Sequence, residues 1–112
     1  MTSSAMLDLT QFRVDFEAGA PTDAPYLEGH FEGMPIVPGA VLLGLAAEAL
    51  GQRGLAIAKI SRMKFQQPLK PDTPFSIEIT GNLEGARISW HATETLIARA
   101  QAVLRREERV DA

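Results

Sequence analysis

The feature that most constrains the fold of this chain is a nearly uninterrupted apolar stretch, AVLLGLAAEAL, at positions 40–50. Only Gly44 and Glu48 within it are neither aliphatic residues nor alanine. A helix formed by these residues has no broad polar face, so it must be buried on most of its sides. The other segments of the chain must therefore be arranged to cover one long helix.

A loop rich in glycine and proline leads directly into this helix. Pro35, Pro38 and Gly39 prevent regular structure before it begins. Gly39 is a candidate N-cap, and Pro38 sets the direction from which the chain enters. The glycines within 51–54 predict where the helix ends. Since His30 stands at the start of this loop, the sequence brings an imidazole to the mouth of the buried helix.

Alternating apolar and polar residues predict strands on both sides of the helix. One strand precedes the helix, at 11–17. Four strands follow it, at 57–65, 75–80, 86–92 and 96–104. In the first of these four, the spacing of apolar residues slips phase once, which predicts a β-bulge.

This order of elements predicts an α+β fold in which one helix lies against a curled antiparallel sheet. The length of 112 residues is within the usual size of one domain. We therefore expect a single domain over 1–112, with flexible ends at 1–9 and 106–112. Trp90 is expected in the core, and the small alanines of the last strand leave room for the helix to approach closely.

The composition excludes several classes of function. The formal net charge is -3, the pI is about 5.3 and the basic residues are scattered, which argues against a nucleic-acid-binding protein. The chain has no cysteine, and His30 and His91 are far apart, so we expect neither a metal site nor a cofactor. With no signal peptide and no apolar run of about 20 residues, we expect a cytoplasmic protein that does not enter a membrane.

Three segments resemble a known family. Residues 30–39, HFEGMPIVPG, are similar to the HFPGxPxxPG signature of hot-dog-fold 3-hydroxyacyl-acyl carrier protein dehydratases and of the related dehydratases of aryl-polyene-type pathways. Residues 63–72, MKFQQPLKPD, resemble the RF-x-x-PVxPGD segment of that family, with Asp72 where a glycine is usual. Residues 98–104, ARAQAVL, match its last strand. The resemblance covers roughly residues 10–105.

The resemblance implies a fold, a substrate class and an assembly. Such proteins wrap a curved antiparallel sheet around one long central helix. They pair two sheets edge to edge in a dimer, with an acyl tunnel at the interface. We expect a homodimer, or a heterodimer with a related hot-dog chain. The substrate that the resemblance implies is a 3-hydroxyacyl group carried by acyl carrier protein or coenzyme A.

The chemistry of such a dehydratase needs a base, an acid and donors to an enolate-like oxygen. His30 fits the base, because imidazole titrates near neutrality. The backbone N–H groups of Gly39 and Ala40 fit the oxygen donors, because free amides and the helix dipole converge at a helix start. We expect Phe31 and Gly44 to line the substrate site beside them.

The acid is where this sequence departs from the family. The resembling enzymes carry Glu or Asp on the helix, fourteen positions after the histidine, and here that position is Gly44. Glu48 is the nearest carboxylate on the same helix face, displaced by ~6 Å along the axis. Other sources are a water bound to Glu48, Glu28 or Glu32 of the loop, or a carboxylate of a partner chain.

Three functional hypotheses follow. The first is an active dehydratase with His30 as base and Glu48, or a partner's carboxylate, as acid. The second is an acid-less subunit that works in a heterodimer or only binds acyl chains. The third is a thioesterase of the same fold, in which Glu48 activates water.

Each candidate also has a purely structural interpretation. Glu48 can belong to a solvated stripe of the helix, and Gly44 can be a notch that lets a strand or an acyl chain approach. His91 lies on the polar side of a strand and is expected at the surface. One set of cations can bind an acidic carrier protein or a phosphopantetheine phosphate, or can simply form a solvated strand face. These cations are Lys59, Arg62, Lys64 and Lys70.

Overall fold

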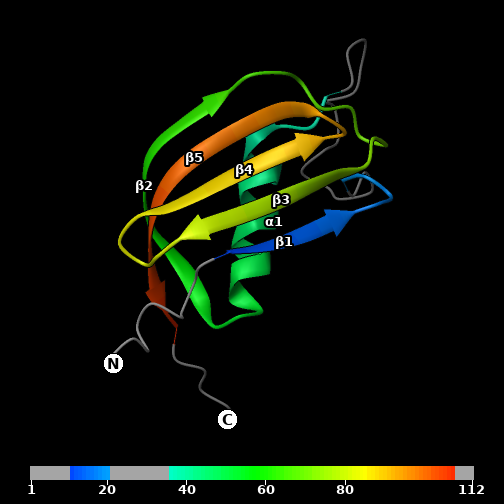
Figure 1. Ribbon diagram of the computed structural model, residues 1–112. Coiled ribbons are helices and arrows are strands. Elements are labelled where there is room, and N and C mark those ends of the chain that lie inside the picture. The colour runs from blue at the N-terminus through cyan, green and yellow to red at the C-terminus, as the bar shows by residue number, and fades with distance from the viewer. Residues whose placement is uncertain (1–10, 21–35, 108–112) are drawn as a thin grey trace.

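The structure is a computed structural model that describes residues 11–20 and 36–107 (Figure 1). His30, Phe31, Glu28 and Glu32 therefore lie outside the described residues. The elements, in chain order, are β1 (Gln11–Phe16), α1 (Gly39–Gly51), β2 (Leu55–Phe65), β3 (Phe75–Gly81), β4 (Ala86–Ala92) and β5 (Thr95–Arg106). This order is the one that the sequence predicts.

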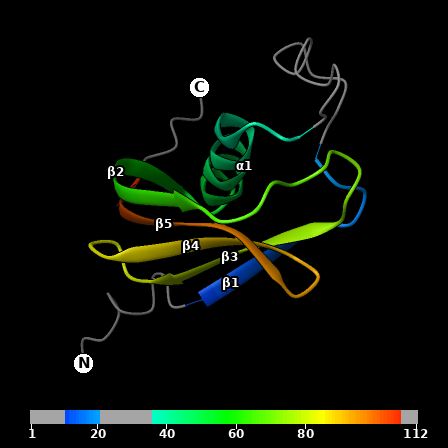
Figure 2. The same ribbon diagram turned by 90° about the horizontal axis from the view of Figure 1, so that it is seen from above.

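The strands form one antiparallel sheet in the order β1-β3-β4-β5-β2. In the chain, β1 precedes the helix and β2 follows it. In the sheet, these two strands are the two edges. The helix α1 lies across one face, and the other face is turned away from it (Figure 2). The prediction of an α+β fold with one helix against a curled sheet is confirmed.

The core fills the space between α1 and the sheet. Trp90 is fully buried, as predicted, and its Nε1 donates a hydrogen bond of 2.9 Å to the carbonyl of Leu42 on the helix. This bond joins the middle of the sheet directly to α1. The largest fully buried side chains besides Trp90 are Leu42, Leu50, Ile77, Ile79 and Ile88.

The prediction that α1 is buried on most sides is only partly right. One side of the helix packs into the core, through Val41, Leu42, Leu45, Ala46, Ala49 and Leu50. The opposite side is exposed, because the sheet covers a single face of the helix in this chain. With 13 residues, α1 is too short to cross a membrane, and no other helix in the described part of the chain is long enough.

Two predicted boundaries and one predicted bulge need correction. The N-cap of α1 is Pro38 and not Gly39, because Gly39 already has helical geometry. In β2 the register against β5 shifts twice, between Ile57 and Lys59 and between Ile60 and Arg62, where the sequence predicted one slip. The last strand continues to Arg106, so the start of the predicted flexible end is paired with Leu55 at the beginning of β2.

Candidate functional site

An apolar hollow of about 350 Å³ opens at the start of α1. Its volume is within the range of small-molecule sites, and hydrocarbon side chains make up most of its wall. It lies between the first turn of α1, the end of β2 and the segment that follows β2. The lining residues are Ile36, Val37, Pro38, Gly39, Leu42, Phe65, Gln66, Gln67, Pro68, Leu69 and Ile97.

A backbone hydrogen bond beside this hollow connects two loops. The N–H of Val37 donates a hydrogen bond of 2.7 Å to the carbonyl of Leu69, which ties the helix entry to the segment after β2. The N-cap Pro38 makes no side-chain hydrogen bond to the first turn. Within the described residues, the N–H groups of Gly39 and Ala40 have no hydrogen-bond acceptor. With respect to the described part of the chain, the start of α1 therefore has free donors beside an apolar hollow.

Phe65 closes one side of the hollow and depends on the glycine at position 39. Phe65 is 56% exposed, which is unusual for a phenylalanine at the end of a strand. A methyl group at position 39 would overlap the ring of Phe65. Glycine at this position thus permits contact between the helix start and the aromatic ring.

The predicted site residues fall on two different sides of α1. Gly39 lines the hollow together with Leu42. Gly44 and Glu48 are exposed and line no part of it. Because successive helical residues turn by about 100°, these two positions point roughly opposite to Gly39 and Leu42. A carboxylate on Glu48 therefore faces outward from the subunit and away from this hollow.

Gly44 is not a packing notch within this chain. A Cβ added at position 44 meets no described atom within 4 Å. The other exposed residues on the same side of α1 are Ala40, Ala47, Glu48, Gly51 and Gln52. A side chain at position 44 would consequently project into the space beside the subunit, with room for a carboxylate.

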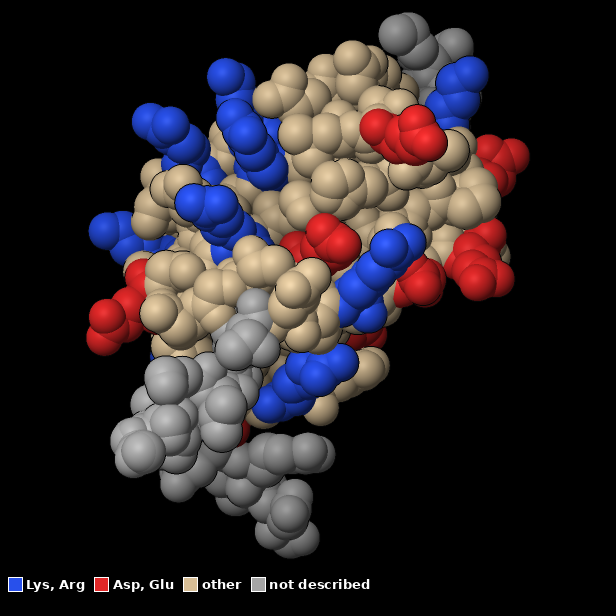
Figure 3. Space-filling model, in the orientation of Figure 1, with Lys and Arg blue, Asp and Glu red and all other residues tan. Residues whose placement is uncertain are grey.

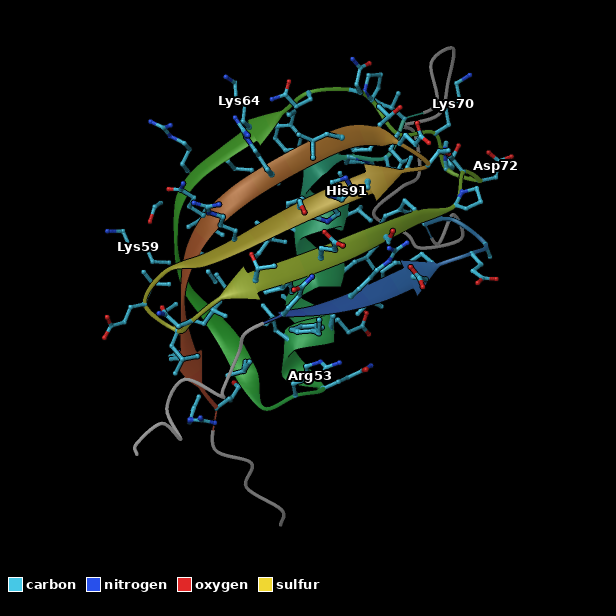
Figure 4. The ribbon with its side chains drawn as sticks, viewed as in Figure 1. Arg53, Lys59, Lys64, Lys70, Asp72 and His91 are labelled. Atoms are coloured by element: carbon cyan, nitrogen blue, oxygen red, sulfur yellow. The ribbon has the colours of Figure 1, made fainter. Side chains whose placement is uncertain are left out.

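A second hollow, of about 550 Å³, lies on the opposite face of the sheet. His91 stands at its border on β4 (Figure 4). His91 is half-buried rather than fully exposed, and its Nε2 shares a hydrogen bond of 2.9 Å with the hydroxyl of Ser89. The nearest Glu78 carboxylate oxygen is 3.9 Å from the same nitrogen. The prediction of a surface histidine holds, with polar neighbours that only strand pairing brings to it.

Sequence reasoning missed several lining residues of both hollows. Ile97 and Leu69 look like ordinary core positions, and only the path of the segment after β2 brings them to the helix start. Arg87 and Arg99 look like isolated surface residues, and only the register of β4, β5 and β2 places them beside Arg62. Across the described residues, no group of three or more His, Cys, Asp or Glu side chains has the arrangement of a metal site.

Comparison with solved structures identifies the fold. The dehydratase heterocomplex ApeI:P from Xenorhabdus doucetiae superposes with a TM-score of 0.71 and 16% identity, over 95% of this chain and 93% of that chain. An uncharacterized protein from Erwinia carotovora subsp. atroseptica gives a TM-score of 0.69 and 21% identity, over 86% of this chain and 83% of that chain. These similarities show that the chain has the hot-dog fold.

Comparison of sequences identifies the family. The chain is 30% identical to the 3-hydroxyacyl-acyl-carrier-protein dehydratase FabZ of Chlamydia trachomatis in an alignment over 92 residues that covers 71% of this chain. The match spans only 60% of the length of that relative. The model of the ApeI-like family, described as ApeI dehydratase, matches residues 7–103. Because that model covers most of the chain, this protein belongs to the ApeI-like dehydratase family.

Proposed function

We propose that this protein acts in the dehydration of (3R)-hydroxyacyl thioesters bound to acyl carrier protein or coenzyme A. The observation that carries the proposal is the apolar hollow at the uncapped start of α1, directly after the HFEGMPIVPG segment. An acyl chain needs such an apolar wall, and a thioester carbonyl needs donors beside it. Membership of the ApeI-like family and the similarity to FabZ support the same reaction.

In the proposed reaction, His30 removes a proton from C2 of the hydroxyacyl group. The electron pair of that C–H bond passes toward the thioester carbonyl, whose oxygen gains negative charge. The N–H groups of Gly39 and Ala40 are suited to stabilise this oxygen, and Phe31 would contact the acyl group beside them. The C3–O bond then breaks, and a proton delivered to the hydroxyl group makes water the leaving group.

We infer that the proton donor acts in a site shared between two subunits. The exposed side of α1 supports this inference, because Gly44 and Glu48 both face away from the hollow of their own chain. Glu48 of a second copy is one candidate acid. A carboxylate of a related hot-dog chain is the other, and the solved ApeI:P neighbour is a dehydratase heterocomplex. Glycine at position 44 favours the second candidate.

A subunit that lacks its own acid is therefore the second candidate function. Such a chain would supply His30 and the acyl hollow, and its partner would supply the carboxylate. The open space beside Gly44 is the observation that favours it. We expect both forms of the protein to act in the cytoplasm, where the carrier-bound substrates are made.

One assay separates these functions from a thioesterase. The purified chain is incubated with a 3-hydroxyacyl thioester, and the enoyl product and the free thiol are measured together. Formation of enoyl product that is abolished in His30→Ala supports the dehydratase. Activity only after addition of a related hot-dog chain supports the acid-less subunit. Release of thiol without enoyl product would show a thioesterase and overturn the proposal.

A further inference from the structure

Four cations gather on the face of the sheet that is turned away from α1. They are Arg62 and Lys64 on β2, Arg87 on β4 and Arg99 on β5, and they all border the second hollow. We call this set the basic cluster. Figure 3 shows a group of basic side chains over the half of this face where β2 and β5 lie, while most acidic side chains lie over the other half, mixed with further basic ones.

Strand register sets these cations in two neighbouring rows. In one row Arg62 and Arg87 flank Gln101 from either side. In the next row Lys64 lies directly opposite Arg99. Neighbouring strands are about 4.8 Å apart and alternate residues of a strand are about 6.7 Å apart. The four charges thus lie within a small area of the sheet. It is about two strand spacings wide across the strands and one alternate-residue spacing long along them.

The pair of Lys64 and Arg99 works against the stability of the sheet. Like charges directly opposite each other on paired strands are destabilising. In the described part of the chain, no member of the basic cluster forms an ion pair with a carboxylate. Glu78, the single acidic residue that borders the hollow, is separated from Lys64 by two intervening strands and faces His91. A feature that costs stability without local compensation points to a function.

The shape of this face favours a large partner. All members of the basic cluster are exposed. The sheet bends around α1, so its outer face is convex (Figures 1 and 2). Although the cluster borders a hollow, small-molecule sites bury most of their ligand, and four exposed charges instead suit an oppositely charged protein surface. The cluster also stands out against the net charge of -3 of the whole chain.

We propose that the basic cluster is the docking surface for the acidic face of an acyl carrier protein. This inference rests on the proposed function, which needs a carrier that presents the thioester. Residues one turn apart on a carrier helix are about 6 Å apart, close to the repeat along β2 and β5. Carboxylates at that spacing match both rows of the cluster.

The cluster is close to the apolar hollow although it lies on the other face of the sheet. Lys64 and Phe65 are consecutive residues at the end of β2, so their side chains point to opposite faces. Lys64 belongs to the cluster, and Phe65 lines the hollow at the start of α1. Because Phe65 is the last residue of β2, a carrier docked on the outer face needs to pass its prosthetic arm only around the end of that strand.

The test measures binding of an unacylated acyl carrier protein to the full chain by fluorescence anisotropy. The double variant Lys64→Glu/Arg99→Glu should raise Kd at least ~tenfold, because like charges then face each other across the interface. The matched control Lys59→Glu/Arg105→Glu changes the same residue types on the same strands, outside the cluster. It should change Kd less than ~threefold, as exposed charges outside a contact do.

A single variant separates docking from a structural role. Arg99→Glu places a carboxylate opposite Lys64, so an attractive cross-strand pair replaces a repulsive one. We expect its melting temperature to rise and its binding of the carrier to weaken. If Arg99→Glu leaves carrier binding unchanged, the docking surface is wrong. The rise in melting temperature shows that the variant is folded.

Two further measurements complete the test. Turnover of a 3-hydroxyacyl N-acetylcysteamine thioester should be equal in wild type and in Lys64→Glu/Arg99→Glu, while turnover of the carrier-bound substrate falls. Loss of both would assign the cluster to folding or chemistry and overturn the docking proposal. The proposed reaction fails separately, if neither protein turns over the small thioester even after a related hot-dog chain is added. Competition by coenzyme A against the carrier at the cluster would show a phosphate site instead, and would also overturn the proposal.

Discussion

At position 44 a single missing side chain limits the acids that the proposed dehydration could use. The dehydratases that this sequence resembles carry a carboxylate at that position. The structure shows open space beside Gly44. Glu48 lies one turn later on the same exposed side. At the residue scale, the proposed dehydration therefore depends on one proton donor, which we expect either from a second subunit or from Glu48.

Gly44→Glu should raise the rate of enoyl formation by about 10²-fold, because a positioned general acid contributes about that much. Folding is not the obstacle, since glutamate is favoured over glycine in a helix by about 0.5–1 kcal/mol. The rate is measured with a 3-hydroxyacyl thioester at saturating concentration. Gly44→Gln is the matched control, because it fills the same space without an acidic proton. An equal rate in both variants would contradict the assignment.

Gly39→Ala should lower turnover without unfolding the protein. The added methyl group overlaps the ring of Phe65, which must swing and reshape the hollow. Since Phe65 is largely exposed, the ring can move without breaking the core. The kcat/KM for an acyl thioester is compared with that of Gly51→Ala, a helical glycine with no neighbour within 4 Å. A normal kcat/KM in Gly39→Ala would remove this hollow from the substrate path.

At the scale of elements, one hydrogen bond connects the two layers of the fold. The indole of Trp90 in β4 donates to the carbonyl of Leu42 in α1, and both residues are buried. Leu42 also lines the hollow at the helix start. The position of α1 against β4 is thus coupled to the shape of the candidate acyl site.

Trp90→Phe should lower the free energy of unfolding by about 1–3 kcal/mol, from the lost hydrogen bond and the cavity left by the smaller ring. Because Trp90 is the sole tryptophan of the chain, unfolding in urea is followed by circular dichroism rather than by fluorescence. We also expect a weaker affinity for the acyl thioester, since the helix start loses a support. A loss below about 0.5 kcal/mol would show that the bond is not important for stability.

At the scale of the whole molecule, the exposed side of α1 indicates a site completed by a second subunit. The side that holds Gly44 and Glu48 is covered by no described part of its own chain. The edge strand β2 is next to the hollow and leaves one edge without a partner strand in this sheet. Such an edge is a template for pairing with another chain.

A mixture of wild type and His30→Ala/Gly44→Glu should show higher dehydratase activity than either protein alone. Wild type supplies the base and the double variant supplies the acid, so only a shared site brings the two together. Activity is measured after the proteins are unfolded and refolded together, against the same amounts refolded separately. An active Gly44→Glu protein whose mixtures show no gain would place the base and acid in one chain.

The sequence by itself determined the order of elements, the burial of Trp90 and the presence of a bulge in β2, because hydrophobic periodicity is a local property. It also predicted a helix start with free donors near Gly39. Tertiary structure alone decided which side of α1 is covered and that the hollow lies on the side of Gly39 and not on that of Gly44, because one sheet covers only one side of a helix. It also decided that Lys64 meets Arg99, since strand register is set by pairing between distant segments. The roles of His30 and Phe31 remain predictions from the sequence.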